Sequence, residues 1–256
     1  SFEPTLDYIV TKVARFPFDK FSDASNKLGT QMKATGEVMS IGRTMEESLL
    51  KAVRSLETGV CHIYHKKFDK WSNDDLLAYI KGGTDDRLYA IGQLIRNGVD
   101  LALIYDKTKI DMFFLEKFKN IVEFENVVRA HPMDVETLRA AKRMGFSDKY
   151  IGQLWGLSQN EMYRLREKNN VFPVYKMIDT CASEFASYVP YFYSTYEEEN
   201  ESIVSGKEKI IVLGSGPIRI GQGVEFDYST VHAIWSIRAA GYEAIIINNN
   251  PETVST

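Results

Sequence analysis

Cysteine is scarce in this sequence, and long apolar runs are absent. The 256 residues include only two cysteines, Cys61 and Cys181, which lie too far apart along the chain to suggest a disulfide framework. No apolar run reaches the roughly 18 residues that a membrane-spanning helix needs. The N-terminal residues Ser1–Pro4 lack the basic and apolar regions of a signal peptide. We therefore expect a cytoplasmic protein.

The sequence also has no excess of positive charge. Its formal net charge of -4 argues against a protein devoted to binding nucleic acid or an anionic membrane. Hydrophobic residues make up 44% of the chain and aromatic residues 12%, which is an ordinary supply for globular domains. The length suffices for one large or two ordinary domains.

Histidine is rare, with four in the chain. Cys61, His62 and His65 offer three potential zinc ligands, but a structural zinc site needs four and no partner pair lies at a suitable spacing. His131 and His232 stand singly, so neither a Ser-His-acid nor a Cys-His arrangement can be argued. The sequence thus predicts no catalytic residue, no cofactor-binding residue and no metal ligand.

The apolar pattern divides the chain into three regions. In the first, residues 7–13 and 36–41 are β-rich, and a capping box from Thr44 to Glu47 opens a helix that ends near Gly59. The second region has amphipathic spacing and predicts a compact all-α bundle. Its helices are expected at about 73–81, 86–97, 111–129, 135–144, 148–155, 159–168 and 175–187.

The third region follows an acidic stretch, 197–206, that predicts an exposed linker. An apolar strand at 210–213, a glycine-rich turn, a helix from about Glu225 to Ala240 and a second strand then form an α/β unit. A unit of about 47 residues cannot bury both faces of its sheet. We therefore expect the unit to be truncated at Thr256 and the chain to be a fragment.

The glycine-rich turn at Gly214–Gly216 could present free N–H groups to a nucleotide phosphate. A dinucleotide-binding fingerprint, however, needs a third glycine where Arg219 stands, and an acidic residue at the end of the second strand, where Asn248–Asn250 stand. A stand-alone nucleotide-binding α/β module remains an alternative that both departures disfavour.

Residues 150–167 have the spacing of a helix-turn-helix, with Gly156 in the turn and Ser158 and Glu161 as a capping pair. Helical hairpins with a glycine turn also recur in many bundles, and the acidic chain gives little electrostatic support for DNA binding. A DNA-binding protein therefore remains an alternative to a structural hairpin. Its base and phosphate contacts would come from Gln159, Asn160, Arg164, Arg166 and Lys168.

Four blocks of sequence, in the same order, resemble the large subunit of glutamine-hydrolysing carbamoyl phosphate synthetase. The most specific is Gly214-Ser-Gly-Pro-Ile-Arg-Ile-Gly-Gln-Gly-Val-Glu-Phe-Asp-Tyr228 with Asn248-Asn-Asn-Pro-Glu-Thr-Val-Ser-Thr256, which is similar to the start of the family's second synthetase half. Residues 1–21 and 30–44 resemble the end of the first half, and residues 174–185 with 193–199 resemble the segment that leads into the second. Residues of about 60–170 match in helical pattern more than in letters.

The resemblance implies a multi-domain, mainly α fold. Residues 1–60 would be the α+β C-terminal end of the first ATP-grasp (carboxyphosphate) half, and residues 61–196 an all-α oligomerisation domain. Residues 197–208 would be a linker. Residues 209–256 would be the truncated α/β, Rossmann-like pre-ATP-grasp unit that begins the second (carbamoyl phosphate) half.

The resemblance also implies an ATP-dependent ligase as the full-length protein, with a place in arginine or pyrimidine biosynthesis. One half phosphorylates bicarbonate, ammonia from a glutaminase small subunit converts the product to carbamate, and the other half phosphorylates carbamate with a second ATP. ATP, Mg²⁺ and K⁺ are the implied cofactors of the full enzyme. The residues that hold them would precede Ser1 or follow Thr256, so we expect no cofactor and no turnover in this fragment. Its implied roles are self-association and coupling of the two halves.

In this family, carbamate travels between the halves through an internal tunnel. The resemblance makes Gly223, Glu225 and Glu252 candidates for its lining, with Glu37 as a further candidate. A small residue would leave room for passage, and carboxylates would hydrogen-bond the polar intermediate, although a charge in a sealed apolar bore is costly. The competing interpretation is that Glu225 and Asp227 stabilise a helix N-terminus and that Glu252 is a turn residue.

Overall fold

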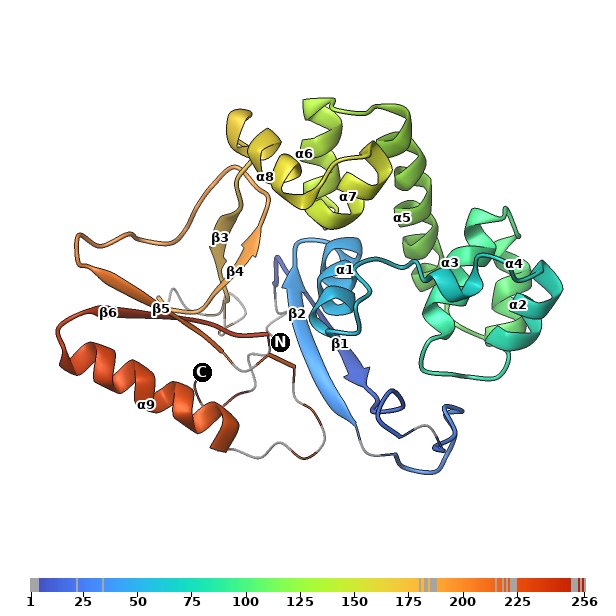
Figure 1. Ribbon diagram of the computed structural model, residues 1–256, viewed down its shortest axis with the longest axis horizontal. Helices are drawn as coiled ribbons and strands as arrows, with labels where there is room; N and C mark the ends of the chain where they lie inside the picture. The colour runs from blue at the N-terminus through green and yellow to red at the C-terminus, as the bar shows by residue number, and fades with distance from the viewer. Residues whose placement is uncertain are drawn as a thin grey trace.

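Helices dominate the computed structural model of this chain, and small two-stranded sheets flank them (Figure 1). Within the described part of the chain, no helix is both long and apolar enough to span a bilayer. For Phe226 only the backbone is described. The described residues are 5–21, 23–33, 35–179, 181, 184, 188–214, 216, 217, 219, 221, 225–249, 253 and 255.

An antiparallel hairpin and one helix form the centre of the molecule. Strands β1 (Ile9–Arg15) and β2 (Gly36–Gly42) pair along their whole length, from Ile9 opposite Gly42 to Arg15 opposite Gly36. Helix α1 (Met45–Ser55) packs on the hairpin. Val38 of β2 is buried there against Ala52 and Leu56.

The predicted capping box at the start of α1 forms with one difference. The Thr44 hydroxyl accepts a hydrogen bond from the Glu47 backbone N–H at 3.2 Å. The Glu47 carboxylate accepts one from the backbone N–H of Arg43, at 2.8 Å, in place of that of Thr44. Two backbone donors at the helix start are thereby satisfied, which is the physical purpose of the motif.

Six of the seven helices predicted for the second region are confirmed to within one residue at each end. Each follows a Ser or Asp, and in all but α3 that side chain accepts a hydrogen bond from a backbone N–H of the first turn. The 3₁₀ turn η1 (Lys66–Phe68) precedes them. The helices are α2 (Asn73–Ile80), α3 (Arg87–Arg96), α5 (Met112–Ala130), α6 (Val135–Arg143), α7 (Asp148–Trp155) and α8 (Gln159–Lys168).

Helix α5 is the longest helix described and lies at the centre of the helical region. It contacts α1 and α3 as well as α6 and α7, and Figure 1 shows α2 and α3 near one end of it and α6 and α7 near the other. Its buried face carries Leu115, Phe118, Ile121, Val122 and Val128, the three-to-four spacing of an amphipathic helix. Each such side chain stabilises the fold by roughly 1.5–3 kcal/mol on burial. Leu50 of α1 belongs to the same core, so the hairpin unit and the helical region are packed together.

Helix α4 (Leu101–Thr108) was not predicted. It has eight residues, and Ile104 is its only fully buried side chain. A single buried position gives no apolar period to detect. The signal that was present is Asp100, whose carboxylate accepts a hydrogen bond from the Ala102 N–H at 2.9 Å and caps the helix. Helix α4 packs against α2 and α5.

The helix predicted at 175–187 is wrong at its start. Residues Val174–Met177 form strand β3, which pairs antiparallel with β4 (Phe192–Thr195). Pro173 disfavours a helix around it, and the partner strand lies too far along the chain to enter a local pattern. The backbone N–H groups of Tyr175 and Met177 also have side-chain acceptors, Asn200 at 2.8 Å and Glu201 at 2.7 Å.

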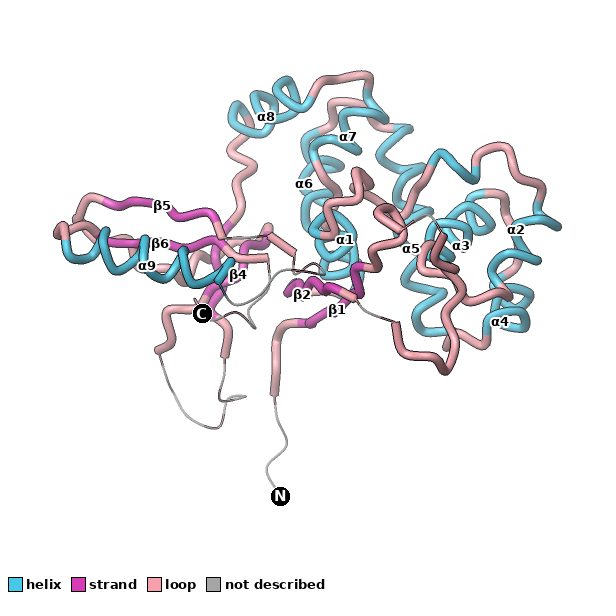
Figure 2. The backbone as a smooth tube through the Cα atoms, turned by 60° about the horizontal axis from the view of Figure 1, so that its bottom comes forward, coloured by secondary structure: helices cyan, strands magenta, loops and turns pink. Residues whose placement is uncertain are grey.

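The predicted strand-helix-strand unit is confirmed. Strands β5 (Lys209–Leu213) and β6 (Glu243–Ile247) are parallel and in register, and α9 (Glu225–Ala239) packs against both. Figure 1 shows the helix on one side of the two strands, and Figure 2 shows β5 and β6 running side by side. The opposite face of the sheet exposes Ile211, Leu213, Ile245 and Ile247, which share it because side chains alternate along a strand.

Candidate functional site

The structure places two of the four predicted tunnel residues. Glu37 lies half-buried in β2, and its carboxylate forms an ion pair with Lys12 of β1 at 3.0 Å. Glu225 is the exposed first residue of α9. Gly223 and Glu252 lie outside the described residues. The two placed carboxylates therefore belong to different units, one to strand β2 and the other to helix α9, and Glu37 pairs with a lysine of its own hairpin.

A hydrogen-bonded corner lies where α9 begins and β6 ends. The buried carboxylate of Asp227 accepts hydrogen bonds from the backbone N–H and the hydroxyl of Ser255, at 2.5 Å and 2.7 Å. The side-chain amide of Asn248 donates to Thr253 at 3.2 Å and to Ser255 at 3.0 Å. The chain beyond β6 is thus tied back onto the first turn of α9.

This corner does not fit the phosphates of ATP. A Cβ atom on Gly214 would lie 1.9 Å from Oδ1 of Asn248, so the missing side chain makes room for Asn248. The first turn of α9 carries the carboxylates of Glu225 and Asp227, which suit the helix dipole themselves and would repel a phosphate. No group of three His, Cys, Asp or Glu that could hold a metal ion occurs among the described residues.

The segment with the three potential zinc ligands has structural roles. The His62 ring is buried, stacked on Tyr150 at 3.7 Å between centroids, and its Nε2 lies 2.9 Å from Oε1 of Glu125. The His65 ring accepts a hydrogen bond from the Lys67 N–H at 3.1 Å and caps η1. Cys61 packs against the helical core.

Glu125 is the centre of a buried charged network that joins α3, α5 and the 61–65 segment. Arg96 donates to both carboxylate oxygens, at 2.8 Å and 2.6 Å, and to the Ile63 carbonyl at 2.9 Å. Burial opposes ionisation of Glu125, but the hydrogen bonds from Arg96 and His62 outweigh it and lower its pKa to about 2. Burial lowers the pKa of His62 to about 4, an effect that Glu125 only partly offsets. The network therefore holds a carboxylate, a guanidinium and a neutral imidazole.

A second buried network involves the predicted helix-turn-helix. The Arg166 guanidinium of α8 donates to both oxygens of Asp148 in α7, at 3.1 Å to Oδ1 and 2.9 Å to Oδ2, and Nη1 donates to the Val171 carbonyl at 3.0 Å. Lys142 of α6 also binds Asp148, at 2.9 Å, and burial lowers the Lys142 pKa to about 8. Arg166 is thus buried and fully engaged inside the protein. The hypothesis that it contacts a DNA phosphate is wrong.

The turn between α7 and α8 is shaped by packing. Gly156 has a φ of 72° and ends α7 in the left-handed conformation. Gly152 lies so close to the Leu157 carbonyl that a Cβ atom would sit 2.5 Å from it. Ser158 and Glu161 form the predicted capping box at the start of α8. Gly156 is therefore explained by its left-handed backbone and Gly152 by close backbone approach, as in a structural helical pair.

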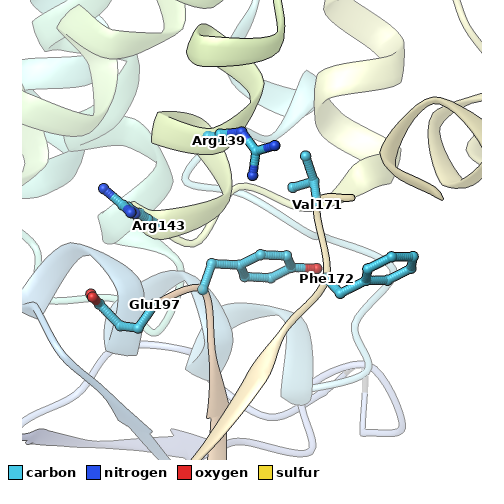
Figure 3. A pocket seen from close by; sticks show the side chains of 6 residues that line it. Arg139, Arg143, Val171, Phe172 and Glu197 are labelled. Atoms are coloured by element: carbon cyan, nitrogen blue, oxygen red, sulfur yellow. The ribbon is translucent and has the colours of Figure 1, made fainter. Parts of the chain in front are cut away.

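A small pocket lies where the helical region meets the chain that leads out of it (Figure 3). It encloses about 40 Å³, which admits a few water molecules at most. The Arg139 guanidinium donates to the Asn169 carbonyl at 2.7 Å, and Arg143 lies 3.7 Å from Glu198. Because the pocket is small and both arginines already have partners within the protein, it does not suit a substrate. Its lining is Arg139, Arg143, Val171, Phe172, Tyr196 and Glu197.

Apolar side chains are exposed at the start of α5. Phe113 and Phe114 are 50% and 41% exposed, and their rings stand edge to face at 5.3 Å. Leu103 and Tyr105 of α4 are also exposed, and α4 contacts α5. Pairs of exposed aromatic rings favour a protein interface, because they bury a large apolar area at a small cost in side-chain entropy.

Sequence reasoning missed the buried charges. Glu125 falls on the apolar face of α5, three residues after Val122 and three before Val128, so the helical period places a carboxylate in the core. A charged residue at a buried position requires a partner. That signal was available in the sequence, whereas the identity of the partners, Arg96 and His62, depends on packing.

Two protein-family models match this chain. The model for "Carbamoyl-phosphate synthetase large chain, oligomerisation domain" matches residues 37–170, which is more than half of the chain and runs from β2 to α8. The model for "Carbamoyl phosphate synthase preATP-grasp domain" matches residues 206–256, which hold β5, α9 and β6.

Proposed function

Because the chain belongs to the carbamoyl-phosphate synthetase large-chain family, we propose that it links the two synthetase halves of an enzyme that makes carbamoyl phosphate. The observation that carries this proposal is the adjacency of the two matches. An oligomerisation domain at 37–170 is followed, on the same chain, by a preATP-grasp domain at 206–256. The complete enzyme would use bicarbonate, glutamine-derived ammonia from a small subunit, and two ATP with Mg²⁺ and K⁺.

We propose the same division of the chain as the resemblance implies. Residues 1–60 would end the first ATP-grasp half, 61–196 would form the oligomerisation domain, 197–208 would link, and 209–256 would begin the second half. The common core of α1 and the helical region supports a firm attachment of the first part to the second. The matched oligomerisation domain itself begins at residue 37.

The helical region would associate with a second copy of the chain through the start of α5. The exposed rings of Phe113 and Phe114 support this choice of surface. Sedimentation of the chain tests it: we expect a concentration-dependent dimer or larger species. Phe113→Ser with Phe114→Ser should weaken association at least tenfold. Tyr163→Ser on α8, which removes an equally exposed ring, is the matched control and should leave association unchanged.

The chain beyond the linker would carry part of the carbamate tunnel, lined by Gly223, Glu225 and Glu252, with Glu37 on the side of the first half. The exposure of Glu225 at the start of α9 and the partial exposure of Glu37 are compatible with a hydrated passage. Gly223→Trp tests the tunnel in the complete enzyme. We expect ATP hydrolysis to continue with less carbamoyl phosphate formed, and glutamine hydrolysis to be unaffected.

The matched control is Gly206→Trp, because a side chain on Gly206 would meet nothing within 4 Å. It should leave the product ratio unchanged. Unaltered carbamoyl phosphate synthesis in the Gly223→Trp enzyme would contradict the tunnel assignment. The 256-residue chain alone should form no carbamoyl phosphate from ATP, bicarbonate and ammonia, and a measured turnover would contradict the assigned role.

A further inference from the structure

The second residue after the end of α1 adopts a conformation that its side chain disfavours. Glu57 has a φ of 53°, in the left-handed region where glycine is the usual residue after a helix. Gly59 stands only two positions further on. Strain of this kind persists where the surrounding structure enforces it, and it is a reason to look for a role of the side chain.

The backbone before Glu57 is firmly held. The Arg15 Nε donates to the Leu56 carbonyl at 3.0 Å, and the same guanidinium forms two hydrogen bonds with Asp19, at 3.1 Å and 2.9 Å. Leu56 itself is buried. The direction in which the Glu57 side chain leaves the end of α1 is therefore fixed by the hairpin.

That side chain meets the glycine-rich segment of the α/β unit, 162 residues later. The Glu57 carboxylate forms an ion pair and a hydrogen bond with Arg219. It also lies against Gly216, whose φ is 78°, and a Cβ atom there would sit 3.2 Å from Oε1 of Glu57. The contact thus joins the region matched as the oligomerisation domain to the region matched as the preATP-grasp domain.

Arg219 stands four residues before Gly223 and six before Glu225 in sequence. We propose that Glu57 and Arg219 are positioning residues: their ion pair anchors the glycine-rich segment, at Gly216 and Arg219, to the end of α1 and sets the alignment of the junction between the two halves. The inference rests on the proposed carbamate passage at that junction. Both side chains are partly exposed, at 48% and 34%, so the pair contributes little to overall stability and its effect is on placement.

A charge swap tests the ion pair directly. Hydrogen exchange of the backbone amides at 214–221 is measured in the 256-residue chain. Glu57→Arg and Arg219→Glu should each raise the exchange rate at least threefold, and the double swap should restore most of the protection. Arg238→Glu, on the exposed surface of α9, is the control and should change nothing in this segment. Unchanged exchange rates in both single variants would contradict the claim that the ion pair anchors this segment.

Glu57→Gly separates placement from stability. Glycine relieves the left-handed strain, so the melting temperature should hold or rise, while exchange at 214–221 should still increase at least threefold. If the amides at 214–221 exchange as slowly in Glu57→Gly as in the wild type, the carboxylate has no positioning role, because the backbone alone then holds the segment.

The functional arm uses the carbamoyl phosphate synthetase that contains this chain. We expect Glu57→Gly and Arg219→Gln to lower the carbamoyl phosphate formed per ATP hydrolysed at least twofold, with recovery in the double swap. If Gly223→Trp lowers this ratio and the Glu57 and Arg219 variants do not, the positioning role is overturned and the tunnel stands. If none of the variants lowers it, the proposed function of the junction fails as well.

Discussion

His62 and Glu125 meet inside the helical core, with 2.9 Å between the imidazole Nε2 and the carboxylate Oε1. Both side chains are almost completely buried. Their contact ties the segment after α1 to the middle of α5, and Arg96 completes it from α3. A polar network that is largely satisfied in this way gives the core a unique arrangement, and it makes the fold sensitive to the loss of any one member.

The first prediction concerns acid stability. Burial lowers the His62 pKa to about 4, below its ordinary value, so the unfolded chain binds a proton at higher pH than the folded one. The contribution of His62 to the free energy of unfolding is fully present above pH 6.5. It falls as the pH drops towards 4, by about 3 kcal/mol in total. The lowered pKa of Glu125 extends the loss below pH 4.5. Urea unfolding followed by circular dichroism at pH 7 and pH 5 measures the difference.

His62→Gln is the test variant, because the amide can still donate to Glu125 but does not titrate. It should reduce the fall in stability between pH 7 and pH 5. His131→Gln, at an exposed ring, is the control and should keep the wild-type dependence. An equal fall in all three proteins would show that the buried imidazole is not its source.

Removal of the central carboxylate should destabilise the helical region strongly. Glu125→Ala leaves Arg96 buried without its partner, which costs about 3–5 kcal/mol. The Glu125→Leu, Arg96→Met double variant should be clearly more stable than Glu125→Ala, since no uncompensated charge remains. Glu123→Ala, two residues earlier on the exposed face of α5, should change the free energy of unfolding by no more than about 0.5 kcal/mol. Chemical denaturation of the wild type and the three variants measures these differences in the free energy of unfolding.

Arg166 should matter for stability and not for DNA. Arg166→Ala leaves Asp148 with Lys142 as its remaining partner and removes the donor to the Val171 carbonyl, so it should lower the free energy of unfolding by about 1–3 kcal/mol. Arg164→Ala, on the exposed side of the same helix, should be nearly neutral. In a gel shift at low salt, neither variant should differ from the wild type. Specific DNA binding that is lost in Arg164→Ala would revive the helix-turn-helix alternative.

Gly92 should resist replacement although it stands within a helix. At an exposed helical site, alanine stabilises the helix by about 1 kcal/mol relative to glycine. A Cβ atom on Gly92, however, would lie 2.6 Å from the Ile63 carbonyl, the same carbonyl that Arg96 binds. We expect Gly92→Ala to destabilise by about 1–3 kcal/mol, as measured by thermal unfolding. Gly206→Ala, where the added atom meets nothing, is the neutral control.

The candidate site could be predicted from sequence only in part. The resemblance identified the family, which the comparisons confirm. The tunnel residues stay predictions, with Gly223 and Glu252 outside the described residues. The Glu57–Arg219 contact could not have been foreseen, because nothing in a local pattern reports a pairing across 162 residues. The strained φ of Glu57 is likewise a property of the folded backbone.

Local sequence signals were enough to predict the helices with a strong apolar period and clear caps, such as α5 and α8, and the β5–α9–β6 unit. Their signals are local, since they depend on residues three or four apart or on a short apolar run within one strand. Tertiary structure decided the rest. Residues 174–177 became a strand because β4 offered a partner, and the short α4 formed because α2 and α5 cover Ile104. The partners of the buried charges also depend on packing. A buried charge needs a partner because desolvation makes an unpaired one too costly, and only the packed structure shows which residues lie close enough.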